Sequence, residues 1–591
     1  MFERWNETLQ KHRVLTGGTL VLVTFLAYAA ALANDFCYDD GQQILTNSFV
    51  LNPHLWKRIF TGSVWSFQGG STNFYRPLQF VCYWLTYRIA GHNPAAFHLV
   101  NLLVYVATVW LVYRLARELF QHEVAALLGA LLWALHPQHV EPVAWISALP
   151  DVGAAFFYLL ALLLFLRAER RLGGRLPAHG VAALVYFPAL FFKEMALSLP
   201  LLLLAYWFVL GPPELWRKRL IRWAPYVLAV GIYVTIRMTV MGSLTQTRFW
   251  NLTGRVVGAS LGLLGQHARL FFWPVQLNDF RTFHLGESLR SPWPWLMILL
   301  VLAALWSRRR EPRLSFFFVW WLVALLPCLD VRQLSTPFVA DRFSLLPSVG
   351  ICLAISYLFV VWLPARLPSF RLAPVALAVL GLVMCFWTAQ TVRAIPRWHD
   401  NETLVEYSYR QVPNQPLLRY SRALVLQYRY GRLDEALEEY REALRLDQRT
   451  ANTWRVGVDY LCYVGMGQIA YQRGQVDLAV SYYEKAVRAS DNNGAAYDSL
   501  GSVYFPRGDY ARAAEYFTHA LKANPYDLGA RFYLGTCWLK LEKYAEAGEQ
   551  FRTARNIDPS YLQAYEAEAR ALEAAGDAAG AARVRGQIPR P

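Results

Sequence analysis

The chain has 591 residues, of which 55% are hydrophobic and 17% are charged, and its formal net charge is +16. Residues 397–591 hold 25 basic and 25 acidic residues, whereas the preceding part holds 33 basic and 17 acidic ones. The whole excess therefore lies in loops between apolar segments, where basic residues set membrane topology, and this placement argues against a nucleic-acid-binding protein. Seven scattered cysteines without a CxxC pair indicate neither a disulfide framework nor a cysteine metal site.

The first apolar segment, residues 14–33, is long enough to cross a ~30 Å hydrocarbon layer as a helix. It lacks a small-residue cleavage site and further apolar segments follow, so we expect a retained helix and not a removed signal peptide. Ten more segments complete the membrane part. The eleven predicted spans lie near residues 14–33, 95–115, 122–137, 146–166, 178–193, 195–211, 222–241, 293–307, 314–329, 342–363 and 372–391.

Basic clusters between these spans, among them residues 308–313, mark the cytoplasmic side. The sides alternate consistently only when residues 252–273 lie on the outer surface as an amphipathic helix. An odd number of spans then places the long first external loop, residues 34–94, and everything after residue 395 on the non-cytoplasmic side. Because the sequence has no endoplasmic-reticulum retention tail and no long low-complexity tract, we predict a bacterial inner-membrane protein with a periplasmic C-terminal domain.

The C-terminal part, residues 396–591, repeats with a period of 34 residues, which separates Pro525 from Pro559. Alanines follow the same step at Ala479, Ala513, Ala547 and Ala581. This spacing is typical of tetratricopeptide repeats (TPR), in which each unit forms two antiparallel helices. We therefore predict a membrane domain over residues 1–395 followed by a TPR solenoid whose concave groove binds a peptide or partner helix.

Two neighbouring carboxylates, Asp39 and Asp40, follow the first span in the stretch "FCYDDGQQILTN". Such a pair can serve as a general base with an orienting partner, or it can bind a divalent cation; a helix cap or solvated loop is the structural alternative. Successive side chains diverge on a strand or a helical turn, so only one of the two is expected to be the base. We favour Asp39, which follows the aromatic Tyr38 and is expected to be partly desolvated.

Four further motifs place polar residues on the same predicted side. "FYRPLQF" contributes Arg76, whose guanidinium can bind a phosphate through two hydrogen bonds. "HPQHVEPVAWI" contributes His136, His139 and Glu141 in a loose metal-like spacing, although two prolines interrupt any single helical face. The motifs "FFKEMALSLP" and "FVADRFSLLPSVG" contribute Lys193, Glu194, Asp341 and Arg342.

Charged residues at membrane depth are rare and mark functional sites by default. A pair between Lys193 and Glu194 that closes a tight turn is the structural alternative at that motif. The sequence predicts no certain cofactor, and a divalent metal is left open.

The order of these motifs resembles a known family. An acidic pair in a long first external loop, on a helical protein of about eleven spans, looks like the GT-C class of glycosyltransferases. Within that class, the motifs "FCYDDGQQILTN", "YRPL", "FHLVNLL", "HPQHVEPVAW", "FKEMALSLP" and "ADRFSLLPSVG", together with the TPR array, resemble the TPR-bearing O-mannosyltransferase-like (TMTC-type) proteins and their bacterial relatives. Where that family commonly shows a glycine-arginine-alanine-aspartate run, Ser147–Asp151 keeps the acid and loses the arginine. Where eukaryotic members favour glutamate-arginine-tyrosine, this chain has "ADRF".

The resemblance implies an all-α fold: a polytopic membrane domain of GT-C type followed by the TPR α-solenoid. It also implies an enzyme that transfers a sugar from a polyprenyl-phosphate donor to a hydroxyl of a protein acceptor recruited by the repeats, with membrane lipid as a further partner. Asp39 or Asp40 is then the base. Because phosphate leaves without protonation, no acid is assigned, and positive charge stabilises the leaving group. The residues implied at the lipid phosphate are Arg76, Lys193 and Arg342, and the remaining substrate-site candidates are His139, Glu141, Glu194 and Asp341.

Two alternatives stay open. One is a lipid-linked oligosaccharide ligase or polymerase, whose arginine-histidine loop normally lies late in the membrane part and has no convincing equivalent here. The other is a non-enzymatic membrane-anchored TPR scaffold, for which one or two spans would suffice.

Overall fold

The computed structural model describes residues 2–68, 72–171, 173–211, 214–242, 254–278, 280–281, 285–329, 339–366, 372–450, 457–490 and 494–589. No β-strand occurs within these ranges, which confirms the predicted all-α class. The chain divides into two compact units. Unit 1 comprises Met1–Gly41 and Asn73–Tyr407, and unit 2 comprises Gln42–Thr72 and Ser408–Pro591. No feature of the sequence predicted that residues 42–72, in the middle of the external loop, would group with the repeats.

Unit 1 contains a helix at each of the eleven predicted spans. These helices are α2 (Arg13–Tyr28), α5 (Pro94–Phe120), α6 (Glu123–Ala134), α8 (Leu149–Arg171), α9 (Leu176–Phe192), α10 (Leu199–Val209), α11 (Trp216–Met241), α14 (Trp293–Ser307), α15 (Pro312–Leu329), α16 (Leu345–Tyr357) and α18 (Leu372–Ala394). Counted with adjoining turns, seven of them are long and apolar enough to cross a membrane, and the other four are shorter apolar helices of 10–17 residues. Unit 1 is therefore a multi-pass membrane domain, while the number of helices that cross stays a prediction.

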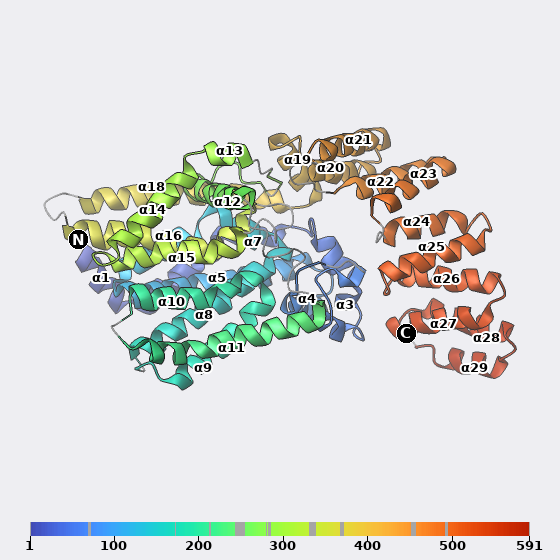
Figure 1. Cartoon of the computed structure of the whole chain (residues 1–591), viewed down its shortest axis with the longest axis horizontal. Helices are drawn as coiled ribbons and strands as arrows, with labels where there is room; N and C mark the ends of the chain where they lie inside the picture. The colour runs from blue at the N-terminus through green and yellow to red at the C-terminus, as the bar shows by residue number, and fades with distance from the viewer. Residues whose placement is uncertain are drawn as a thin grey trace. The chain divides into compact units, whose positions relative to one another are not determined.

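The helices of unit 1 run side by side around α5 and α8 (Figure 1). Two polar side chains inside this bundle hydrogen-bond to backbone carbonyls of neighbouring elements: the Tyr105 hydroxyl donates to the Ala134 carbonyl at 2.8 Å, and the Trp133 indole nitrogen donates to the Leu345 carbonyl at 3.0 Å. Helices α15 and α16 approach each other so closely that a Cβ atom at Gly350 would lie 2.4 Å from the Phe317 carbonyl oxygen. Such hydrogen bonds between elements and close backbone packing make this bundle a stable frame for the loops that connect its helices.

Helix α12 (Gly254–Phe272) differs from the predicted spans because it is amphipathic. It packs against α13 (Leu285–Arg290), α14 and α15, with Leu263 and Leu270 fully buried. It also carries polar residues, Gln266 and Arg269 among them, that are partly exposed. The amphipathic character agrees with the sequence analysis, and its position on the outer surface of the membrane stays a prediction.

The described residues of unit 2 include five helix pairs between positions 416 and 586, whose later members are orange to red in Figure 1. The pairs are α20 (Pro416–Tyr428) with α21 (Leu433–Thr450), α22 (Asp459–Gln472) with α23 (Val476–Ala489), α24 (Gly494–Tyr504) with α25 (Tyr510–Ala523), α26 (Leu528–Lys540) with α27 (Tyr544–Ile557), and α28 (Leu562–Ala574) with α29 (Ala578–Gly586). Small residues occupy the crossings: a Cβ atom at Gly501 would lie 2.7 Å from the Phe517 ring. The alanines of the 34-residue period are fully buried, which confirms the predicted TPR architecture.

Candidate functional site

Asp39 and Asp40 lie in a tight turn that follows α2. The Cys37 amide donates to Oδ2 of Asp40 at 3.1 Å, and the Asp40 amide donates back to the Cys37 carbonyl at 3.1 Å. Tyr38, at the centre of the turn, has φ of +54°, a left-handed conformation that is uncommon outside glycine. Its amide donates to the Asn401 side chain at 2.6 Å. A residue held in such a conformation costs about 1–3 kcal/mol, and residues of this kind concentrate at functional sites.

Asp40 points into the protein and is fully buried. Its Oδ1 accepts hydrogen bonds from the Ser147 amide at 2.8 Å and the Ser147 hydroxyl at 2.5 Å. Burial raises the pKa of Asp40 to about 7, and the hydrogen bonds from Ser147 oppose that rise. Asp40 thus fastens the turn to the segment that precedes α8. In the sequence, Ser147 is distinguished only as the start of the stretch that departs from the family pattern.

Asp39, by contrast, is partly exposed. Burial raises the pKa of Asp39 to about 6, and the positive charge of Arg342 opposes that rise. The two neighbouring carboxylates therefore occupy different environments, one locked by hydrogen bonds and one beside a cation. This arrangement agrees with the stereochemical expectation that only one of them would face a given site.

Lys193 and Glu194 do not pair with each other, so the alternative of a closing Lys193–Glu194 pair is wrong. The Lys193 ammonium binds Oδ1 of Asp151, on α8, at 2.5 Å. Glu194 instead accepts two hydrogen bonds from Arg76, at 2.9 and 3.2 Å. Arg76 immediately precedes α4 (Pro77–Ala90), so these pairs tie the external loop and the start of α8 to the turn between α9 and α10.

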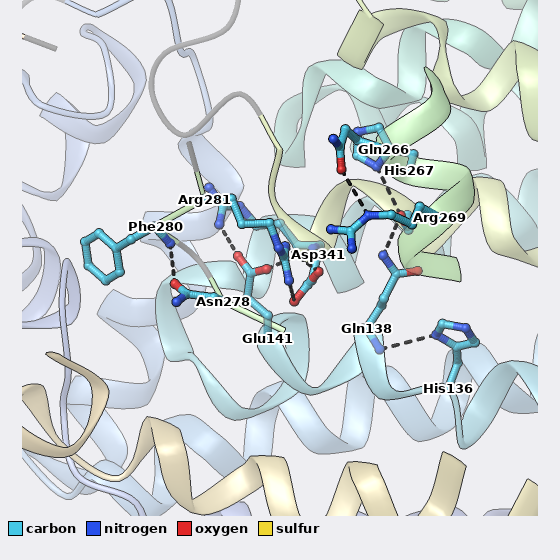
Figure 2. A network of polar contacts seen from close by, with 12 residues as sticks. His136, Gln138, Glu141, Gln266, His267, Arg269, Asn278, Phe280, Arg281 and Asp341 are labelled. Carbon is cyan, nitrogen blue, oxygen red and sulfur yellow. Dashed lines mark hydrogen bonds and ion pairs between the residues drawn. The ribbon is translucent and has the colours of Figure 1, made fainter. Parts of the chain in front are cut away.

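Asp341 and Arg342 also pair with residues from other elements, and Figure 2 shows Asp341 beside Arg281. Arg342 forms an ion pair with Glu141 of α7 (Val140–Ala144), and its amide donates to the same carboxylate at 3.0 Å. Asp341 accepts hydrogen bonds from Arg281 at 2.8 and 3.3 Å. Arg281 was not predicted as a site residue, because no sequence motif around it distinguishes it from the other basic residues.

Two of the predicted cations meet at one aromatic ring. The Lys193 ammonium and the Arg342 guanidinium each lie 5.2 Å from the centre of the Phe343 ring. Arg342 also lies 5.0 Å from the Trp145 ring, and the Tyr38 ring packs 5.6 Å from Trp145 on its centroid. Shared aromatic residues thus bring the two cations close to the turn that carries the aspartates. Each cation is attracted to the face of the ring beside it.

The histidines of the "HPQHVEP" motif belong to the core. His139 is fully buried between the Tyr105 and Ser348 hydroxyls, each at 3.0 Å. His136 contacts the Phe271 carbonyl at 3.1 Å through Nε2. Their spacing with Glu141 therefore does not form a ligand set, and no three His, Cys, Asp or Glu side chains gather as metal ligands in the part of the chain that the structure describes.

Helix α12 contributes a further cation, Arg269, to this region (Figure 2). Nε of Arg269 donates to Oε1 of Gln266 at 3.3 Å, and His267 contacts the Ser344 hydroxyl at 3.3 Å. Within the described residues, Arg269 forms no ion pair, whereas the cations at positions 76, 193, 281 and 342 each have a carboxylate partner. The side chain of Arg255, the other arginine that the sequence placed on this helix, lies outside the described residues.

Residues 76–242, which include Arg76, Lys193 and Glu194 of the site, match the family described as dolichyl-phosphate-mannose-protein mannosyltransferase. Residues 424–494 match the tetratricopeptide repeat family, and residues 472–554 match the family described as anaphase-promoting complex, cyclosome, subunit 3. The chain resembles the TPR-bearing O-mannosyltransferases. The match begins at Arg76 and contains Glu141, Lys193 and Glu194, so it covers the middle motifs of the resemblance; the motifs "FCYDDGQQILTN" and "ADRFSLLPSVG" lie outside it.

Individual relatives support the same conclusion. Over 143 residues the chain is 38% identical to protein O-mannosyl-transferase TMTC2 of Mus musculus, a match that covers 24% of this chain and 17% of that protein. It is 22% identical over 448 residues to a protein O-mannosyl-transferase of Caenorhabditis elegans, which covers 72% of this chain and 62% of that protein. Among solved structures, the TPR protein YrrB is 23% identical and covers 31% of this chain and 90% of its own, with a TM-score of 0.26. The chain thus matches less than two thirds of the length of these O-mannosyl-transferases.

Proposed function

We propose that this protein is a membrane glycosyltransferase that moves a mannosyl residue from a polyprenyl-phosphate donor to a hydroxyl of a protein held by its repeats. The reaction takes place on the non-cytoplasmic side, which for a bacterial inner-membrane protein is the periplasm. The observation that carries the proposal is the environment of Asp39, a partly exposed carboxylate beside Arg342 whose pKa burial raises to about 6. The similarity to protein O-mannosyl-transferases supports the choice of sugar and of a protein acceptor.

In the proposed reaction, Asp39 accepts the proton of the acceptor hydroxyl while the hydroxyl oxygen attacks the anomeric carbon. The bond between that carbon and the phosphate oxygen breaks, and the lipid phosphate leaves with the electron pair. A base with a pKa close to the working pH suits this role. Asp40 acts as a positioning residue, because its hydrogen bonds to Ser147 hold the turn that presents Asp39.

Lys193 and Arg342 hold the leaving phosphate in this proposal, and Arg76 assists. Their carboxylate partners fix these side chains in advance, so little reorganisation is needed when negative charge develops on the phosphate. Arg269 is a further donor toward the same phosphate, since it lies in the same polar network without an ion-pair partner among the described residues. No step is assigned to a metal ion.

The activity should fall at acidic pH. The assay uses the purified full chain, synthetic polyprenyl-phosphate mannose and a serine- and threonine-containing peptide, and it measures kcat/KM between pH 5 and 8. Asp39 works ionised and burial raises its pKa to about 6, so the rate should fall roughly tenfold for each pH unit below 6. The pKa of Asp40 is raised to about 7, so Asp40 also becomes protonated in this range. Protonation weakens its hold on the turn that carries Asp39, which should make the fall in rate steeper. A flat profile over this range would contradict a carboxylate base, and failure to transfer at any pH would refute the proposed function.

The proposed side of the membrane is tested separately by reporter fusions in a bacterial host. A phosphatase that requires export should be active when fused after residue 395, and a cytoplasmic reporter should be active when fused at Arg310. This outcome follows from an odd number of crossings with a cytoplasmic N-terminus. Cytoplasmic activity from the fusion after residue 395 would place the repeats on the wrong side for this function.

A further inference from the structure

Residues 42–72 form part of the external loop in sequence, but they fold with the repeats in unit 2. This segment contains the short helices α3 (Ser48–Leu51), η3 (Trp56–Phe60) and η4 (Ser66–Gln68). Its apolar residues Phe49, Val50 and Phe67 are buried. Helices of three to five residues do not persist in water without tertiary packing, so the segment takes its structure from contacts with its neighbours.

The segment contacts the repeats through aromatic and polar groups. The Phe49 ring meets the Tyr526 ring edge to face, with the ring centres 5.1 Å apart, and the Arg58 guanidinium lies 5.6 Å from the same ring. The Asn52 side chain donates a hydrogen bond to the Ile557 carbonyl at 2.9 Å. Tyr526 joins α25 to α26, and Ile557 ends α27, so both contacts lie where one repeat ends and the next begins.

The chain on either side of this segment is fixed in unit 1. Asp40, which Ser147 holds, is separated from Gln42 by Gly41 alone. At the other end, Arg237 donates to the Asn73 carbonyl at 2.6 Å and to the Asn73 side chain at 2.7 Å. The chain therefore passes between the two units at residues 41–42, 72–73 and 407–408.

We propose that the repeat surface around Tyr526 and Ile557 is a docking site for this chain's own segment 42–72, and that this docking positions an acceptor on the repeats for transfer at Asp39. The proposal rests on the proposed function. If residues 407–408 were the only connection between the two units, the repeats could adopt many orientations. An acceptor bound to the repeats would then meet the aspartates in only some of them, which lowers its effective concentration at Asp39. Docking of the segment adds two connections, one of which begins next to the aspartate pair.

The test compares one acceptor peptide in two forms. A serine- and threonine-containing peptide is fused after α29 through a short linker, and the same peptide is supplied free to the unfused chain. We expect Tyr526→Ala to lower transfer to the fused peptide about threefold to tenfold, because an edge-to-face aromatic contact is lost, and to change transfer to the free peptide less than twofold. Asn52→Ala removes a contact to the repeats that comes from segment 42–72, and it should likewise lower transfer to the fused peptide. Tyr544→Ala is the matched control, since Tyr544 begins α27 at the other end of the same repeat.

Hydrogen exchange of residues 44–60 in the full-length protein measures docking independently of sugar transfer. Tyr526→Ala and Asn52→Ala should speed exchange in this segment, and Tyr544→Ala should not. If hydrogen exchange is unchanged in both Asn52→Ala and Tyr526→Ala, the proposed docking site is refuted. Faster exchange with unchanged transfer to the fused peptide would overturn the positioning role. If the parent chain modifies neither peptide, the proposed function fails, and the exchange comparison still decides whether the segment docks.

Discussion

Replacing Asp39 by asparagine should lower sugar transfer by about 10²–10⁴-fold while leaving donor binding intact. Asparagine has nearly the same shape as aspartate but cannot take the proton from the substrate hydroxyl, so the substitution removes the base and keeps the shape of the side chain. The measurement is single-turnover transfer from polyprenyl-phosphate mannose to the peptide acceptor, with donor binding measured separately on the same protein. The part of the pH dependence that comes from the pKa near 6 should be lost from the remaining activity, and only the weaker dependence that comes from Asp40 should remain.

Changes at Asp40 separate the base from the residue that positions it. Ser147→Ala removes the hydroxyl donor to Asp40 but keeps the amide donor, so the turn should loosen and transfer should fall less than in Asp39→Asn. The pH dependence should survive in Ser147→Ala, since Asp39 is still present. Parental rates in both Asp39→Asn and Asp40→Asn would show that the pair only shapes the loop, and the proposed mechanism would fail.

Replacing Arg342 by alanine should weaken use of the lipid-linked donor by about 10²–10³-fold, the usual cost of losing one preorganised donor at a developing charge. The same change also leaves Glu141, a buried carboxylate, without its guanidinium partner. Breaking such a buried pair from one side destabilises a protein by about 3–5 kcal/mol, so the thermal unfolding of each variant must be measured beside its activity.

A paired substitution distinguishes the two effects. Arg342→Gln combined with Glu141→Gln removes both charges and leaves no unpaired buried ion, so stability should recover while donor use stays low. Lys193→Ala and its partner change Asp151→Asn provide the same comparison at the second cation. Full transfer rates in the Arg342 and Lys193 variants would refute their role at the phosphate, and Arg269 would then be the cation to test.

Helices and repeats followed from the sequence because both depend on local pattern. A membrane helix is recognised from about 20 neighbouring apolar residues, and each of the eleven predicted spans coincides with a helix. The repeats were recognised from alanines spaced by 34 residues, which the structure buries at the helix crossings. The motifs around Asp39, Arg76, Lys193 and Arg342 were likewise identified from short stretches, because the resemblance to the O-mannosyltransferases is carried by those stretches.

Only the tertiary structure decided which residues meet. Three hydrogen-bonded pairs are far apart in the sequence: Ser147 and Asp40 are separated by 107 positions, Glu141 and Arg342 by 201, and Asn52 and Ile557 by 505. Spacing along the chain says nothing about such contacts, because they depend on how separate helices pack. The same limit explains why His136 and His139, whose spacing suggested a metal site, are core residues with rings held by Phe271, Tyr105 and Ser348. The sequence determined which polar residues this protein carries between its apolar helices, and packing of those helices determined their partners.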